Sequence, residues 1–329
     1  MKAIAPGKII LFGEHAVVYD KLGVAAAVGI YTTATIEKNK ENNIILTDPW
    51  RTQKINKKQL KNEMEKIEKL IEEKKFNSIV RLINKDKGVI GRYVIGLLLK
   101  EDFIPFKINI KTNLRKGMGT SASLSSAIAK VVSDFIGIRL SKEKISEISF
   151  KGDILCHGGT PSGIDNNTIV YGGFLSFRKS EGFKKINIKD EIPIVIGDTK
   201  KKVNTADMVS RVKALQEKNA KVRNAINDIE EISKEGIKAI KQNNLIKIGE
   251  LMDQNQEKLR LLNVSTPQLE KLIKASKEAG AYGAKLTGAG GGGCMIAVTD
   301  EQENVAKAIR KAGGDAIISS LGVEGVRSV

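Results

Sequence analysis

The chain has 329 residues, 41% of them hydrophobic, and carries 55 Lys and Arg against 38 Asp and Glu, a formal net charge of +17 at pH 7. This hydrophobic content is enough for packed cores, so the composition excludes a wholly disordered chain, and no stretch approaches the roughly 20 consecutive apolar residues of a membrane span. With only 2 Cys and 2 His, a disulfide framework and a Cys/His zinc site are also excluded.

Short apolar runs and charged helical patterns alternate through the first half of the chain. Lys2–Ala5 and Ile9–Phe12 are predicted as two strands around a Pro6-Gly7 turn. Tyr31–Glu37 and Ile44–Thr47 are predicted as a hairpin. Further along, the patterns predict a helix over Asn56–Lys75, a helix over Val80–Leu99 interrupted near Lys87-Gly88, a strand over Phe106–Lys111, helices over Ala122–Ile136 and Lys142–Cys156, and a strand over Gly173–Phe177.

The second half is richer in helices. The patterns predict helices over Thr205–Gln242, Leu245–Leu262, Thr266–Ala279 and Gln302–Ala312, and strands over Ile192–Ile196, Ala284–Leu286, Cys294–Val298 and Asp315–Ser319. Both halves are therefore predicted to contain helices and strands of an α+β fold. The charged segment Arg178–Glu191 lacks apolar periodicity and is the best boundary candidate, which divides the chain into domains 1–183 and 184–329.

A loop rich in glycine and hydroxyl groups precedes the helix predicted from Ala122. Gly117-Met118-Gly119-Thr120-Ser121 would place clustered backbone N–H groups at the positive end of that helix, an arrangement that binds phosphate oxygens. The hydroxyl groups can cap the helix or ligate a magnesium ion that bridges phosphates. The chain contains neither a GxxxxGK[ST] loop nor the HRD sequence of protein kinases, which argues against both of those phosphate-transfer classes.

A second glycine-rich loop, Gly288-Ala289-Gly290-Gly291-Gly292-Gly293, formally contains GxGxxG. A dinucleotide site needs a helix after this motif, and here an apolar run typical of a strand follows, so that interpretation is rejected. Five glycines in six residues favour close approach of the backbone to a ligand over a purely structural hairpin.

Single residues beside these motifs are ambiguous from their pattern alone. Asp165 follows Pro161-Ser162-Gly163-Ile164 in a predicted turn, and Lys8 begins an apolar strand; most such residues are solvated. Both histidines of the chain lie next to motifs, His15 after Gly13-Glu14 and His157 before Gly158-Gly159, which favours a functional role for these segments.

Four segments then decide the family: APGKIILFGEHAVV, GMGTSAS, HGGTPSGID and KLTGAGGGGC. In this order they resemble the GHMP kinase superfamily, and the GEH and PSGID sequences resemble the mevalonate kinases of archaeal type within it. Galactokinases continue with a GEHTDY-like sequence, and diphosphomevalonate decarboxylases lack GEH. The chain departs from the family pattern at the following places: Asn113 for the usual Pro, Arg115 and Lys116 for small residues, Thr120 for the first loop serine, and one extra residue at Gly158-Gly159.

The resemblance implies an α+β, two-domain fold. Residues 1–183 would form an ATP-binding domain like domain 2 of ribosomal protein S5, and residues 184–329 a ferredoxin-like domain with added helices. It also implies Mg²⁺-dependent transfer of the ATP γ-phosphoryl group to the C5 hydroxyl of mevalonate, a step of isoprenoid biosynthesis. Dimers are common in the family, so a homodimer is expected.

The resemblance assigns roles residue by residue. Asp165 matches the catalytic aspartate and Lys8 the lysine of the first motif; Ser121 and Asp153 match magnesium ligands, with Asp for the commoner Glu. The backbone that would hold the ATP phosphates comprises Gly117, Met118, Gly119, Thr120, Ser121 and Ala122. The residues that would contact the acceptor are Glu14, His15, Thr205 and Gly290. The segment Lys200–Lys202 could attract anionic groups, and Cys156 and Cys294 are assigned to packing.

Two alternatives remain. Arg115-Lys116 and Lys200–Lys202 could suit an acceptor with an extra phosphate, as in phosphomevalonate kinase. The charge of +17 could instead indicate a nucleic-acid-binding protein, but aromatic residues are only 5% and Lys54–Lys75 mixes Lys with Glu, which favours a solvated helix face. We therefore expect ATP and mevalonate as partners, no nucleic acid and no membrane. The few cysteines and the lack of a signal-peptide pattern at the start predict a cytoplasmic location.

Overall fold

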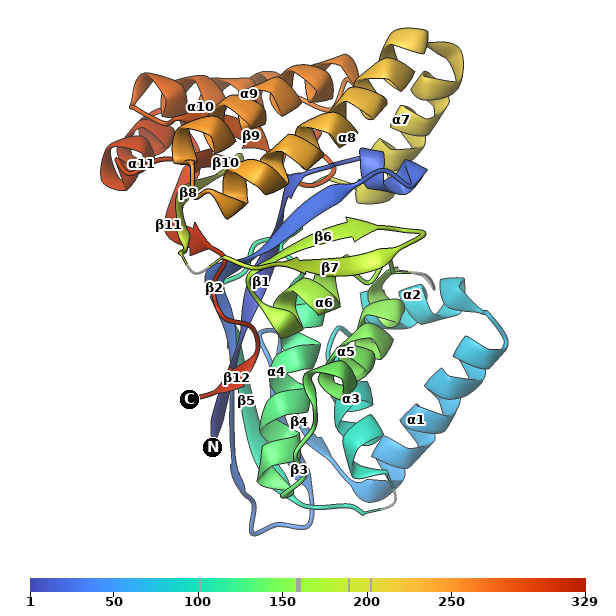
Figure 1. Cartoon of the computed structure of the whole chain (residues 1–329). Helices are drawn as coiled ribbons and strands as arrows, with labels where there is room; N and C mark the ends of the chain where they lie inside the picture. Colours follow the sequence, from blue (N-terminus) through green and yellow to red (C-terminus); the bar gives the residue numbers. More distant parts are fainter. Residues whose placement is uncertain (101, 158–160, 189, 202) are drawn as a thin grey trace. The chain divides into compact units, whose positions relative to one another are not determined.

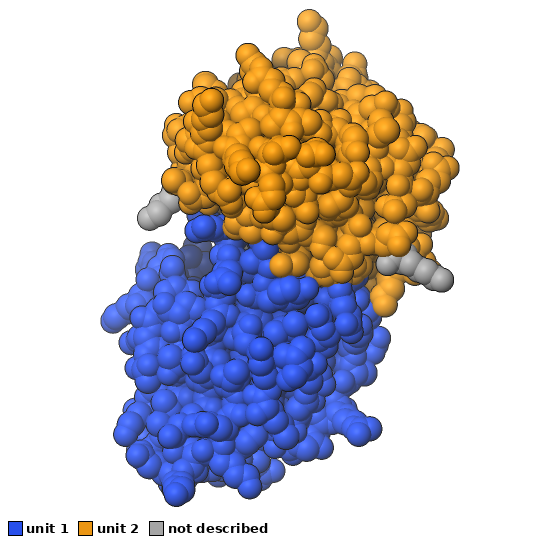
Figure 2. All heavy atoms as spheres, turned by 90° about the vertical axis from the view of Figure 1, so that its left-hand side faces the viewer, with its two compact units in different colours: residues 1–7, 30–172, 324–329 blue, residues 8–29, 173–323 orange. Residues whose placement is uncertain are grey.

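The structure is a computed structural model of the chain and describes residues 1–329 except 101, 158–160, 189 and 202. The described chain forms two compact units (Figure 2). Unit 1 comprises Met1–Gly7, Ile30–Gly172 and Glu324–Val329, and unit 2 comprises Lys8–Gly29 and Gly173–Val323. Each unit therefore combines segments that are far apart in the sequence. The functional division into domains 1–183 and 184–329 stays a prediction.

Strands β1 (Lys2–Phe12) and β2 (Gly23–Lys38) each contribute residues to both units. The prediction of two strands around a Pro6-Gly7 turn is wrong, because β1 runs through both residues without a break. The φ angle fixed by the proline ring is compatible with extended backbone. Gly7 is not among the glycines with positive φ, so it does not use the freedom that many turns require.

In unit 1 the sheet has the order β4 (Thr52–Ile55), β3 (Ile44–Thr47), β5 (Phe106–Thr112) and β2. β5 pairs with β2 antiparallel, while β3 pairs with β5 in parallel and with β4 in a tight antiparallel hairpin. The predicted hairpin between β2 and β3 is therefore wrong, because β5 lies between them. The short strand β12 (Arg327–Ser328) pairs with β1.

Unit 1 also contains the following helices, labelled in Figure 1, of which α4 contacts β5 of the sheet: α1 (Lys57–Glu72), α2 (Phe76–Lys85), α3 (Val89–Leu99), α4 (Thr120–Phe135), α5 (Lys142–His157) and α6 (Ile164–Tyr171). The predicted interruption near Lys87-Gly88 is confirmed as the break between α2 and α3. α6 was not expected; its first turn contains Asp165, which the sequence placed in a simple turn.

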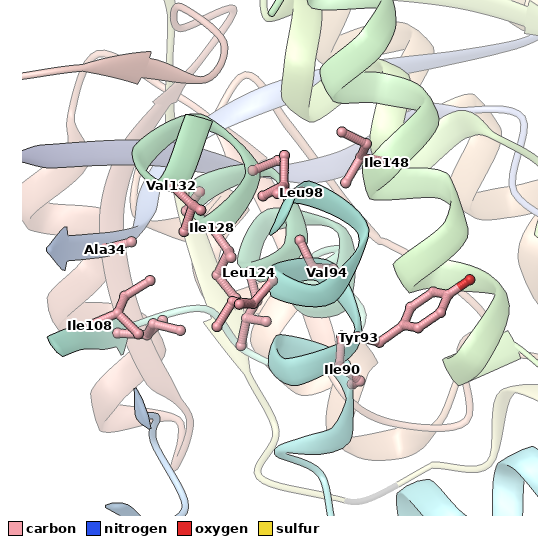
Figure 3. Close-up of a cluster of buried hydrophobic side chains, with 14 of the residues drawn as sticks. Ala34, Ile90, Tyr93, Val94, Leu98, Ile108, Leu124, Ile128, Val132 and Ile148 are labelled. Atoms are coloured by element: carbon pink, nitrogen blue, oxygen red, sulfur yellow. The ribbon is translucent and has the colours of Figure 1, made fainter. Parts of the chain in front are cut away.

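The core of unit 1 surrounds α4 (Figure 3). Leu124, Ile128 and Val132 are spaced four residues apart, so they lie on one face of α4, with Ile108 of β5 and Ala34 of β2 in the same cluster. Other buried members of this cluster are Ile90, Tyr93, Val94, Leu98 and Ile148. α4 is therefore a central helix, and its first turn is held by packing on several sides.

In unit 2 the strands β11 (Asp315–Leu321), β8 (Ile192–Asp198), β10 (Cys294–Val298) and β9 (Gly283–Leu286) lie side by side and antiparallel. β6 (Phe174–Arg178) pairs with the start of β2 and with β7 (Gly182–Ile186). β7 falls inside the charged segment that the sequence interpreted as a boundary.

The helices of unit 2 are η1 (Ala16–Tyr19, a 3₁₀ turn), α7 (Thr205–Lys218), α8 (Ala220–Lys241), α9 (Leu245–Leu261), α10 (Pro267–Glu278) and α11 (Gln302–Lys311). The single helix predicted over Thr205–Gln242 is two helices. Asn219 separates them: its backbone is extended, and its side chain accepts a hydrogen bond from Lys221 N at the start of α8. Within the described parts of the chain, no helix combines the length and apolar character needed to cross a membrane.

Candidate active site

The predicted phosphate loop leads directly into α4 of unit 1. Gly117 and Gly119 have φ angles of 92° and 72°, in the left-handed region that favours glycine. Gly119 is the N-cap of α4, and no side chain of the described residues caps this helix end. The N–H groups of the first turn and the positive end of the helix dipole can therefore bind an anion.

Ser121 and Asp153 form a pair beside this loop. Ser121 Oγ in the first turn of α4 donates a hydrogen bond to Asp153 Oδ1 of α5 at 2.6 Å, and Asp153 is only 2% exposed. One turn further along α5, burial and the nearby Asp153 carboxylate raise the pKa of the Cys156 thiol to about 12. The thiol therefore stays protonated at neutral pH and lies against the core, which suits the packing role expected for it.

Asp165 lies against the same loop. It stands in the first turn of α6, and a Cβ atom at position 119 would be 3.4 Å from Asp165 Oδ2 and 2.9 Å from Ile169 Cδ1. Asn166 Nδ2 donates to Ser146 Oγ of α5 at 2.8 Å, which fixes α6 against α5. Unit 1 thus brings together the phosphate loop, the Ser121–Asp153 pair and Asp165.

The Ser121–Asp153 pair fits a magnesium ion. Its donors are a hydroxyl and a carboxylate oxygen, the hard ligands that Mg²⁺ prefers, and they are already within hydrogen-bond distance of each other. The described residues contain no group of three or more His, Cys, Asp and Glu that could hold a metal on their own. Mg²⁺ usually keeps several waters and binds one or two protein ligands together with substrate phosphates, so two ligands suffice.

Glu14 and Lys285 form a buried ion pair in unit 2, and the side chains of both are 0% exposed. Lys285 Nζ donates to Glu14 Oε1 and, at 2.8 Å, to Leu286 O. Burial raises the pKa of Glu14 above its ordinary value, while the charges of Lys285 and, more weakly, Lys8 oppose this rise. Burial likewise lowers the pKa of Lys285, and Glu14 opposes that change.

His15 is held in one tautomer. Its Nε2 lies 2.9 Å from Ala289 O, and because a carbonyl oxygen only accepts, Nε2 carries the proton and donates. Burial lowers the pKa of His15, so the ring is neutral at pH 7 and Nδ1 is an acceptor. The backbone has a φ of 61°, a strained conformation of the kind that gathers at functional sites.

The second glycine-rich loop has a structural explanation at one position. Gly290 has a φ of 72°, and a Cβ atom there would lie 2.3 Å from Val264 O. Gly291 N donates to the same carbonyl at 2.6 Å, and Thr287 Oγ1 ties the loop to β1 by donating to Ile10 O at 2.9 Å. Gly290 is thus required by the backbone of the protein itself, and its contact with the acceptor stays a prediction.

The other predicted site residues of unit 2 differ in exposure. Lys8 is 6% exposed, and its charge acts on Glu14. Thr205 is exposed at the start of α7, where Asn204 caps the helix. Lys200 is exposed and pairs with Asp315 at 3.0 Å. Lys202, the segment 158–160 and the side chain of His157 lie outside what the structure describes.

Sequence patterns alone did not single out Lys285. It stands in the fourth motif segment, in a four-residue strand whose residues are all buried. A buried lysine within such an apolar strand is unusual unless it has a partner, so this burial pattern was the available signal. Unit 2 thus gathers Lys8, Glu14, His15 and Lys285 around the start of the second glycine-rich loop.

The chain is similar to known proteins over nearly its whole length. The family model described as GHMP kinases N terminal domain matches residues 88–173, and the one described as GHMP kinases C terminal matches residues 237–315. Mevalonate kinase of Pyrococcus abyssi is 34% identical over 340 residues, covering 99% of this chain and 96% of the relative.

Solved structures agree with this similarity. The crystal structure of the Methanococcus jannaschii mevalonate kinase matches with a TM-score of 0.82 at 29% identity, covering 98% of both chains. The crystal structure of L. major mevalonate kinase in complex with R-mevalonate has a TM-score of 0.80 at 24% identity, covering 99% of this chain and 97% of that one, which is a likeness of fold. The expected α+β, two-domain GHMP kinase fold is thereby confirmed, and the chain belongs to the GHMP kinase family, within the mevalonate kinases.

Proposed function

We propose that this chain is a mevalonate kinase that transfers the γ-phosphoryl group of ATP to the C5 hydroxyl of mevalonate, giving 5-phosphomevalonate and ADP. The observation that carries this proposal is the cluster in unit 1: an uncapped helix start after two left-handed glycines, a hydroxyl–carboxylate pair and a further carboxylate at the same loop. The full-length similarity to curated mevalonate kinases supports mevalonate as the acceptor.

The first turn of α4 binds the ATP phosphates. Its backbone N–H groups donate to phosphate oxygens, and the helix dipole favours their negative charge. Ser121 Oγ and an Asp153 oxygen would hold Mg²⁺, whose positive charge offsets the charge on the phosphates when it is bound. The protein contributes by keeping both oxygens beside the loop, where the packing of α4 and α5 fixes them.

Asp165 acts on the acceptor. As the C5 oxygen forms a bond to the γ-phosphorus, the bond from that phosphorus to the bridging oxygen of ADP breaks, and Asp165 takes the hydroxyl proton. In a loose transition state little proton transfer is needed early, so Asp165 mainly orients the alcohol. Lys8 stabilises the negative charge of the transferring group, and positioning and electrostatics supply most of the acceleration.

Glu14, His15, Thr205 and Gly290 recognise the acceptor in this proposal. At neutral pH the unprotonated Nδ1 of His15 accepts a hydrogen bond and cannot donate one, so it suits a hydroxyl group and not the mevalonate carboxylate. The carboxylate then needs cations, for which the exposed Lys200 and Lys201 are candidates. A homodimer and a cytoplasmic location also remain predictions; light scattering during gel filtration tests the former.

The test is ADP release by the purified chain, coupled to a spectrophotometric assay, with mevalonate, phosphomevalonate, galactose and homoserine as acceptors. We expect turnover with mevalonate and at most weak turnover with the others. Turnover with phosphomevalonate alone would favour the alternative kinase. No turnover with any acceptor, together with tight and strongly salt-dependent binding of nucleic acid, would favour the other alternative.

A further inference from the structure

Lys285 enters the interior of unit 2 from an edge of its sheet. On β9 the flanking residues Ala284 and Leu286 belong to the hydrophobic core. Because side chains alternate along a strand, Lys285 points to the opposite side, where it meets Glu14 of the loop after β1. These two residues are 271 positions apart in the sequence, so the pair joins two distant segments of unit 2.

The two oxygens of Glu14 have different surroundings. Oε1 accepts the hydrogen bond from Lys285, whereas Oε2 is buried and has no hydrogen-bond partner among the residues that the structure describes. Buried carboxylate oxygens in proteins are nearly always hydrogen-bonded. Glu14 Oε2 therefore calls for a donor that the described chain does not provide.

The chemistry of a carboxylate limits what that donor can be. An ionised carboxylate only accepts hydrogen bonds, so it repels the mevalonate carboxylate and the ATP phosphates and attracts a hydroxyl group. Mevalonate has two hydroxyl groups, and the proposed reaction directs the one on C5 to Asp165. The C3 hydroxyl is then the remaining donor, and of the two acceptors Glu14 Oε2 and His15 Nδ1 it is the buried Oε2 that lacks a partner among the described residues.

We propose that Lys285 is a positioning residue for acceptor recognition: its hydrogen bond to Glu14 Oε1 holds the carboxyl group in one orientation, so that Glu14 Oε2 accepts a hydrogen bond from the C3 hydroxyl of mevalonate. This inference rests on the proposed function and adds the contact that distinguishes mevalonate from alcohols without that hydroxyl. Lys285 acts through Glu14 and takes no part in phosphoryl transfer.

The charges around Glu14 determine what removal of Lys285 does. The charged groups that act on it are Lys285, in direct contact, and Lys8, more weakly, while the adjacent His15 is neutral at pH 7. Without Lys285, burial dominates and the pKa of Glu14 rises further, so the carboxyl group takes up a proton at a higher pH. Glu14 also loses the bond that fixes its rotamer.

The experiment measures KM and kcat for mevalonate and ATP with the full chain, from about pH 6 to pH 9. Lys285→Met should raise the KM for mevalonate about 10–100-fold, more at low pH, while the KM for ATP stays unchanged. Lys285→Arg should restore most of the loss, because it keeps the charge. The matched control is Lys277→Met, which removes an exposed lysine that pairs with Asp253 and should leave both KM values unchanged.

A second arm tests the same contact through Glu14 and the substrate. Glu14→Gln should raise the KM for mevalonate as Lys285→Met does, without the pH dependence, and the double variant should be no worse than either single one. With 5-hydroxy-3-methylpentanoate, which lacks only the C3 hydroxyl, the native chain should lose about the same factor. Glu14→Gln should lose nothing further with this analogue.

The outcomes separate the alternatives. The inference is overturned if Lys285→Met leaves the KM for mevalonate unchanged. It is also overturned if Lys285→Met lowers kcat and thermal stability equally at every pH and this loss adds to that of Glu14→Gln, because such a result indicates a purely structural role for Lys285. If Lys285→Met does not fold, the Glu14→Gln and analogue measurements decide, because Lys285 can still donate to the Gln amide oxygen. If the native chain does not phosphorylate mevalonate, the proposed function itself has failed.

Discussion

Replacing Gly119 with alanine perturbs the phosphate loop in two ways that can be separated. The φ angle at this position is 72°, and an L-residue in the left-handed region costs about 1–2 kcal/mol. In addition, the new Cβ atom would lie 2.9 Å from Ile169 Cδ1, so the end of this buried side chain must move, and 3.4 Å from Asp165 Oδ2, in direct contact with the carboxylate. The first effect lowers stability, and the second crowds the proposed catalytic aspartate.

Gly137 provides the matched control. Its φ is 78°, close to that of Gly119, but a Cβ atom there would meet no atom of the described residues within 4 Å. Both variants should therefore lose the stability that a left-handed backbone costs an L-residue, a drop in melting temperature of about 2–8 °C for a unit of this size, and Gly119→Ala should lose more because of its contact with Ile169. Only Gly119→Ala should also lose activity, by about 10–100-fold in kcat, because small displacements of reacting groups are costly.

The assay combines thermal unfolding followed by circular dichroism with steady-state ADP release at saturating ATP and mevalonate. The reasoning fails if Gly119→Ala keeps the kcat of Gly137→Ala within about twofold, a difference too small for displaced reacting groups. It also fails if Gly137→Ala alone loses kcat, since its position lies beyond the far end of α4 from the phosphate loop.

Three further predictions follow from the site. Ser121→Ala and Asp153→Asn should each raise the Mg²⁺ concentration for half-maximal activity about 10-fold or more, measured by titration of the metal at fixed ATP. Asp165→Asn should lower kcat by about 10²–10⁴-fold with little change in the KM for ATP. Burial lowers the pKa of His15 below its ordinary value, so the unfolded chain binds a proton at this ring more readily than the folded chain does. The stability contributed by neutral His15 is therefore complete above about pH 6.5 and is lost as the pH falls through the pKa of the folded state. Thermal melts at acid and neutral pH test this: the native chain should lose more stability on acidification than His15→Gln, which lacks this titration.

Elements with local signals were predictable from the sequence. Asn56 and Gln59 form a capping box at the start of α1, and Thr266 caps α10 with Pro267 in its first turn. The phosphate loop was predictable for the same reason, since its glycines and the following helix are adjacent in the sequence. The helix itself begins two residues earlier than expected, at Thr120.

The wrong and missing predictions concern features that depend on residues far apart in the sequence or on a weak helical pattern. Whether β3 pairs with β2 or with β5 depends on the pairing of distant strands, about which the local sequence of the predicted hairpin contains no information. α6 is short, and its apolar residues Ile164, Ile169 and Val170 do not mark a single helix face, so the pattern gave no helical period. The Glu14–Lys285 pair joins two motifs at opposite ends of the chain, and only the fold shows that they meet.

The measurement that tests the central claim most directly is identification of the product. The purified chain is incubated with ATP, Mg²⁺ and mevalonate, and the mixture is followed by phosphorus NMR and by ADP release. We predict one phosphate monoester, coupled to the C5 methylene protons and formed in equal amount to ADP, and about 10²–10⁴-fold slower formation of this product with Asp165→Asn. ADP without a mevalonate ester, or an ester at the C3 oxygen, would contradict the proposed reaction.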